Sequence, residues 1–300
     1  MTPAAKLAAA RRACAEAFQA DAMRDLLPDF AGPDGARRAF DLLGRAAALH
    51  HPEPQVLARW AAIPEFDRAQ GLLLAASLHA IEQMPGLPVS DTVKDLFADE
   101  FLFYAAPPAQ WRERFRLADV RFQEMARIAT LQRFPAGQYH WEIAAFPRSW
   151  LPRVEQKWMA LRQAFLPMRG FGPAFELHVN DRRKNRVMMS EFETNLSCYR
   201  AARSLALQPR MKAIMTASWL YCESTGAVTP HLAWMRRLFL EAGAAIVDLG
   251  EAPADSGFLI GSVERRKLYE EGRYRPKMSC VLWPRERVLR WAAEHPEFDR

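Results

Sequence analysis

Apolar side chains in the first 130 residues recur every three or four positions, which is the spacing of one face of an α-helix. Pro64 stands where a first-turn proline would, and Ser90 or Asp91 suits a helix N-cap. Pro52 ends an earlier stripe, because the residue before a proline is pushed out of the helical region. We therefore expect helices over residues 1–15, 34–50, 64–84, 90–101 and 111–129.

After Phe134 the pattern changes to short aromatic and β-branched runs that alternate with helical stripes. The runs predict strands at residues 138–144, 174–179, 211–220, 244–249 and 278–283, and a further one at 258–261. The stripes predict helices at residues 150–166, 190–207, 229–242, 263–271 and from 285 onward. We expect an α+β fold: a helical N-terminal layer, residues 1–132, followed by a mixed α/β sheet region, residues 133–300.

Composition limits the class of protein. Apolar residues make up 50% of the chain and charged residues 25%, as in a soluble globular protein. The sequence contains no apolar run of the ~20 residues that a membrane helix needs, and its N-terminus lacks the apolar core of a secretion signal. The four cysteines are far apart, which favours reduced thiols. We therefore expect a cytoplasmic protein that does not bind membranes.

Basic residues are concentrated in the second part of the chain. The first 130 residues carry 15 basic and 17 acidic side chains, whereas the remainder carries 26 and 18. A basic half attracts phosphates on a nucleotide cofactor, on an acidic metabolite or on RNA. An arginine-rich solvated surface explains the same surplus without any ligand.

The first predicted strand of the sheet region carries the densest group of polar and aromatic residues. His140 and Glu142 share one face of that strand, because side chains alternate with period two. Such a pair suits proton transfer, and Arg148 just beyond it suits an anionic substrate group. Alternatively, His140 and Glu142 bond one another at the sheet edge while the neighbouring aromatic residues fill the core.

The next predicted strand ends with Glu176 and His178 on one face. If the two strands are neighbours, His140, Glu142, Glu176 and His178 can meet. Two histidines and two carboxylates suit iron, manganese or zinc, so we keep these four as alternative metal ligands. His178 is otherwise a candidate for binding the substrate.

Arg182, Arg183 and Arg186 link that strand to the following helix. Positive charges ahead of a helix N-terminus predict an anion site. A solvated basic loop is the alternative, because the chain has neither form of glycine-rich phosphate loop.

The strand predicted at residues 211–220 leads to Ser218 and Tyr221. Ser218 lies outside a G-x-S-x-G elbow, which disfavours a serine hydrolase and leaves it as a substrate-binding candidate. Tyr221 is a candidate general acid, or alternatively a hydrogen-bonded core tyrosine.

The order of elements within residues 170–285 resembles the acetyltransferase-like (GNAT) fold. A strand leads through a basic turn into a long helix and a second strand, and Leu238-Phe-Leu-Glu-Ala-Gly243 is similar to that family's approach to a late strand. In that family a glycine-containing turn binds the pyrophosphate of coenzyme A, whereas residues 182–186 contain no glycine. Residues 134–141, with Pro147 and Arg148, are also similar to aminoacyl-tRNA–protein transferases, which use a related fold.

These resemblances imply a bacterial acyl- or aminoacyl-transferase that acts on a small amine-containing substrate. The donor would be a coenzyme A thioester or an aminoacyl group. His140 or Glu142 would take the amine proton, Tyr221 would protonate the leaving group, and the arginines would hold anionic groups. A metal-dependent enzyme is the second hypothesis, and a non-catalytic RNA- or partner-binding protein is the third.

Overall fold

A computed structural model of the protein describes residues 1–19, 30, 34–48, 63–109, 120–180, 190–254, 256–257, 259 and 262–299. The chain forms two compact units. Met1–His140 with Asn180–Val187 make up the first, which we call the helical unit. Trp141–Val179 with Met188–Arg300 make up the second, which we call the sheet unit. The boundary at residue 132 stays a prediction.

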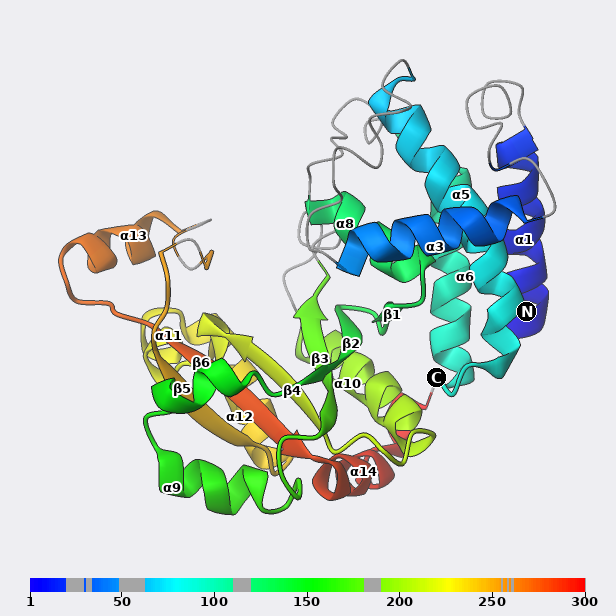
Figure 1. Ribbon diagram of the computed structural model, residues 1–300. Coiled ribbons are helices and arrows are strands. Elements are labelled where there is room, and N and C mark those ends of the chain that lie inside the picture. The colour runs from blue at the N-terminus through cyan, green and yellow to red at the C-terminus, as the bar shows by residue number, and fades with distance from the viewer. Residues whose placement is uncertain are drawn as a thin grey trace. The chain divides into compact units, whose positions relative to one another are not determined.

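The helical unit confirms the elements expected from the apolar spacing (Figure 1). α5 begins directly after Pro64 and α6 directly after Ser90. α1 packs against α5 and α6, and α3 packs against α5 and α8. The predicted helix end at residues 50–52 and the first part of the helix at 111–129 lie outside the described residues. The helices are α1 (Pro3–Gln19), α3 (Gly35–Ala48), α5 (Glu65–Gln83), α6 (Asp91–Ala105) and α8 (Val120–Ala129).

Within the described residues, six strands form one mixed sheet in the order β1-β2-β3-β4-β6-β5. β3 runs parallel to β4, and β6 lies antiparallel between β4 and β5. The α+β class is therefore confirmed. Most of the strand predicted at 258–261 lies outside the described residues. The strands are β1 (Arg133–Pro135), β2 (Tyr139–Ala145), β3 (Pro173–Val179), β4 (Ala213–Ser218), β5 (Ala245–Glu251) and β6 (Lys277–Pro284).

Helices cover one face of this sheet. Trp283 of β6 is fully buried there, with its ring 5.8 Å from that of Phe239 and 5.1 Å from that of Trp291. Its indole N–H donates to the carbonyl oxygen of Ala242 at 2.9 Å. These contacts hold α12 (Ala233–Glu241) and α14 (Arg285–Glu294) against the sheet, and α10 (Glu191–Ala206) packs against α14. Two shorter helices, α11 (Glu223–Val228) and α13 (Val263–Glu270), complete the unit.

An irregular segment covers the opposite face. It consists of the 3₁₀ stretch η3 (Arg148–Arg153), the short helix α9 (Lys157–Ala160) and the π-helical stretch η4 (Leu161–Phe165). Its buried side chains Ala164 and Phe165 belong to one core cluster with residues of β4, β5 and β6: Met215, Val247 and Leu282. We call residues 148–171 the covering segment.

The prediction of one continuous helix over residues 150–166 is wrong. Pro152 has no N–H to donate, and Val154 after it is extended. The N–H of Glu155 donates to the carbonyl oxygen of Asp248 in β5 at 3.0 Å instead of to its own helix. The apolar spacing that suggested a helix reflects side chains that reach the sheet from three short pieces.

Replacement of Trp283 by alanine is expected to lower the free energy of unfolding by about 3–5 kcal/mol, because it empties a large buried site. It also removes the donor to the Ala242 carbonyl. Urea denaturation followed by circular dichroism measures the change. Leu240→Ala on α12 is the control, because Leu240 is 46% exposed and its loss should cost less than about 0.5 kcal/mol. Equal losses in both variants would contradict this packing.

Candidate functional site

The two parallel strands of the sheet unit separate toward their carboxyl ends. The residue pairs in register are Phe175 with Ile214 and Glu176 with Met215, although each strand continues for three more residues. Figure 1 shows β3 and β4 diverging beyond this point. The carboxyl ends of parallel strands are where open α/β sheets bind ligands, so this gap is the centre of the candidate site.

Three polar side chains from β2 and β3 meet on one side of the gap. Glu142, Glu176 and His178 place one ligand atom each within 4.8 Å of one another. His178 Nε2 lies 3.3 Å from Glu142 Oε1, and these two side chains are 29% and 18% exposed. We call this group the Glu–His cluster. The side chains of His178 and Glu142 are partly exposed, whereas the Nε2 atom of His178 itself is buried.

Chemically, the Glu–His cluster can act in two ways. An imidazole nitrogen or a carboxylate oxygen of this group can take a proton from an approaching amine. The same three side chains offer oxygen and nitrogen ligands that suit manganese, iron or zinc. His140, the fourth predicted ligand, is not one of the three; it is fully buried.

The predicted anion-binding residues divide into two groups. Arg148 is exposed and begins the 3₁₀ stretch η3. Arg182, Arg183 and Arg186 lie outside the described residues. The helix they precede, α10, already has carboxylates in its first turn, Glu191 and Glu193. Those negative charges satisfy the helix dipole, so the described part of this N-terminus is not an anion site by itself.

Ser218 and Tyr221 lie at the end of β4, on the other side of the gap. Ser218 Oγ accepts the N–H of Leu220 at 3.2 Å, which starts the 3₁₀ turn η5 (Trp219–Tyr221). The Tyr221 hydroxyl is fully buried, 3.5 Å from the Thr216 hydroxyl. Thr216 points to the helix-covered face, whereas Met215 beside it packs under the covering segment. Tyr221 therefore lies on the face opposite the one that Met215 occupies.

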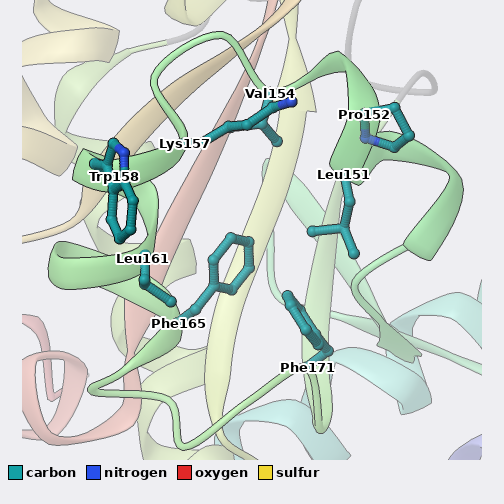
Figure 2. Close-up of a pocket in the computed structure, with 8 residues that line it drawn as sticks. All are labelled: Leu151, Pro152, Val154, Lys157, Trp158, Leu161, Phe165 and Phe171. Carbon is teal, nitrogen blue, oxygen red and sulfur yellow. The ribbon is translucent and has the colours of Figure 1, made fainter.

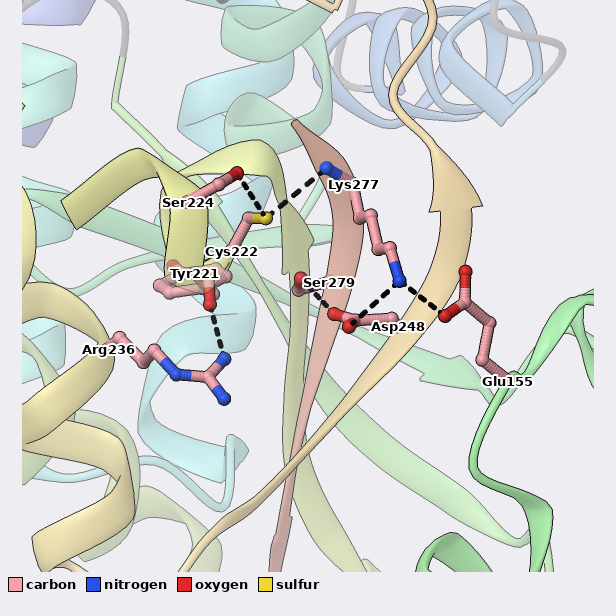
Figure 3. Close-up of polar contacts among 8 residues, drawn as sticks. All are labelled: Glu155, Tyr221, Cys222, Ser224, Arg236, Asp248, Lys277 and Ser279. Carbon is pink, nitrogen blue, oxygen red and sulfur yellow. Dashed lines mark hydrogen bonds and ion pairs between the residues drawn. The ribbon is translucent and has the colours of Figure 1, made fainter. Parts of the chain in front are cut away.

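A polar network surrounds this turn (Figure 3). Arg236 donates to the Tyr221 carbonyl at 2.7 Å, and Cys222 Sγ accepts the N–H of Lys277 at 3.3 Å. On the same strand as Lys277, the Ser279 hydroxyl donates to Asp248 at 2.6 Å. These contacts fix the turn that carries Tyr221 to both α12 and β6.

Lys277 also ties the covering segment to the sheet. Its ammonium lies 2.5 Å from Glu155 Oε2, and this hydrogen bond raises the pKa of the lysine. The two residues are separated by 122 positions. Sequence reasoning missed this pair because the pattern of the chain holds no signal for a contact at that separation.

Three of the four cysteines are too strongly buried to ionise readily. Burial raises the pKa of the Cys14 and Cys198 thiols to about 12 and that of Cys280 still further. A thiol must ionise to act as a nucleophile, so these three are structural. All four cysteines are free, in keeping with the expectation of reduced thiols.

No protein-family model and no curated protein matches the sequence. The structure is similar to solved structures of acyltransferases, one in complex with decanoyl-CoA and teicoplanin and another with CoA and 10C-teicoplanin. Each comparison covers 87% of both chains with a TM-score of 0.50, at 13% and 12% sequence identity. An acyltransferase mutant in complex with octanoyl-CoA matches equally, at 13% identity and a TM-score of 0.50. This likeness shows a shared fold.

In the part of the chain that the structure describes, every helix is too short or too polar to cross a bilayer.

Arg236→Ala is expected to loosen the turn that carries Tyr221. The variant leaves the Tyr221 carbonyl without its donor, at a cost of about 1–3 kcal/mol, and amide hydrogen exchange in residues 219–228 should accelerate. Arg237→Ala is the matched control, because Arg237 is exposed and pairs only at 3.5 Å or more with Glu191 and Glu241. Unchanged exchange in Arg236→Ala would refute the role given to this hydrogen bond.

Proposed function

We propose that the protein is an acyltransferase that moves an acyl group from a coenzyme A thioester to an amine. The observation that carries the proposal is the gap between β3 and β4: beyond Glu176 and Met215 the two strands are no longer in register, next to the Glu–His cluster. An extended thioester arm can hydrogen-bond to such strand edges as an added strand would. The shared fold with acyltransferases and the element order similar to the GNAT fold support the same proposal.

The Glu–His cluster is the general base in this proposal. Glu176 and His178 lie on β3, which borders the gap, and Glu142 reaches them from β2. The amine nitrogen attacks the thioester carbonyl while the cluster takes its proton. The new C–N bond forms, the C–S bond breaks, and the departing thiolate takes a proton to become free coenzyme A. Taking the amine proton at a positioned base accelerates such a reaction about 10²–10⁴-fold.

Tyr221 remains our proposed donor of the proton to the thiolate. It follows β4, the second strand that borders the gap, and its carbonyl is held by Arg236. Because its hydroxyl is on the helix-covered face, it would reach the sulfur from the side opposite the base. A leaving group that passes through the gap would contact both faces.

The anionic part of the donor requires cations. We propose Arg182, Arg183 and Arg186 for this role, since they follow β3 directly in the sequence. Arg148 is the proposed partner of an anionic group on the acceptor. Ser218 has a local role in starting η5, and its contact with substrate stays a prediction. The aminoacyl donor and RNA or partner binding by the basic half also stay predictions.

The proposal is tested with acetyl-CoA and octanoyl-CoA against a panel of amino acids, polyamines and amino sugars, with thiol release as the readout. Glu176→Gln and His178→Gln are expected to lower kcat by roughly 10²-fold while binding of coenzyme A, measured by calorimetry, persists. His295→Gln is the matched control, because His295 forms a comparable ion pair with Glu297 at 2.8 Å on the surface. Absence of coenzyme A binding and of thiol release would overturn the proposal.

A metal-dependent enzyme is the second candidate, favoured by the spacing of the Glu–His cluster. Calorimetric titration with Zn²⁺ and Mn²⁺ tests it. Binding of one equivalent that is lost in both Glu176→Gln and His178→Ala, but kept in His295→Ala, would assign the cluster to metal binding. If the cluster is a general base, we expect that neither Zn²⁺ nor Mn²⁺ binds.

A further inference from the structure

The covering segment encloses an apolar pocket that the reaction proposed above does not use (Figure 2). The cavity has a volume of about 660 Å³, within the range of small-molecule sites. Trp158 and Leu161 form one side, Leu151 and Phe171 form the other, and Phe165 lies between them. Its lining is apolar except for Lys157.

The floor of the pocket is part of the protein core. Phe165 is only 7% exposed, and its ring lies 4.6 Å from that of Phe171 and 5.1 Å from that of Phe146. The mouth is open, because Trp158 is 79% exposed and Leu161 is 37% exposed. Large apolar side chains gathered around a built cavity indicate a site for an apolar ligand.

The pocket and the Glu–His cluster lie on the same face of the sheet. Ala174, Glu176 and His178 alternate onto one face of β3, and Ala174 belongs to the same core cluster as Phe165. On β2, Ala144 packs against that cluster and shares its face with Glu142. A ligand with its tail in the pocket therefore does not need to cross the sheet to present a carbonyl to the base.

The rim of the pocket is basic. Lys157 forms no ion pair with any residue that the structure describes. Arg153 and Arg162 of the same segment are exposed, whereas the acidic residue nearest in sequence, Glu155, is paired with Lys277.

We propose that this pocket binds the hydrocarbon chain of the acyl donor, so that the enzyme uses medium- to long-chain acyl thioesters. The inference rests on the proposed acyltransferase function. Burial of each methylene tightens binding about fourfold, so affinity should rise with chain length until the cavity is full.

Calorimetry with coenzyme A and its acetyl, butanoyl, octanoyl, decanoyl and palmitoyl thioesters tests the proposal on the full-length protein. The dissociation constant is expected to fall about fourfold per methylene through the shorter chains and then to level off. Trp158→Ala removes one exposed wall and should reduce the preference for decanoyl-CoA over acetyl-CoA by tenfold or more. Leu166→Ala is the matched control, because Leu166 is 61% exposed on the same segment and does not line the pocket.

A second variant distinguishes loss of the pocket from loss of the folded structure. Leu161→Trp adds volume at the mouth and should shift the preferred chain toward shorter lengths, which an unfolded protein cannot do. Equal affinity for acetyl-CoA and decanoyl-CoA, unchanged in Trp158→Ala, would overturn the pocket proposal and leave the acyltransferase function standing. If no thioester binds, the acyltransferase function itself fails. Binding of decanoate or of lipid vesicles, lost in Trp158→Ala, without binding of decanoyl-CoA would assign the pocket to another lipid.

Discussion

Unequal pairing of β4 with its two neighbours is the constraint on which the site depends. On one edge β4 pairs with β6 along all six of its residues, from Ala213 to Ser218. On the other edge it is registered with β3 at only two positions. The strands β4, β6 and β5 therefore stay paired as an antiparallel block while β3 departs from it. The divergence lies in the sheet interior, where buried backbone groups require hydrogen-bond partners.

The two faces of the sheet are covered by different means. Trp283 and the aromatic rings around it pack α12 and α14 closely on one face, as regular helices do. The other face is covered by three short pieces of different helical types, anchored by Glu155 and Lys277. The regular helices pack closely on the sheet, whereas the covering segment encloses a cavity. The face with the cavity is also the face with the Glu–His cluster.

The sequence predicted most of the fold because each element has its own local pattern, such as the proline before α5 or the apolar run of β6. The neighbouring positions of Glu142 and His178 followed from alternation once β2 and β3 were assumed to be adjacent. Local patterns say nothing about contacts far apart in sequence, so Lys277 with Glu155 was missed. They also did not reveal that Tyr221 and Glu142 lie on opposite faces, because that depends on the turn η5. Pro152 was the available signal that the covering segment is broken.

The covering segment is one continuous stretch of the chain, and it supplies every wall of the cavity. The side chains proposed for the reaction belong instead to the strands beneath it. The residues proposed to select the acyl chain and those proposed to react therefore lie in separate stretches of the sequence. An exchange of about twenty codons, with the Glu155 anchor retained, would replace the cavity while leaving the strands intact. Proteins that share this sheet can therefore differ in the proposed acyl-chain pocket without a change in the strands that carry the proposed base.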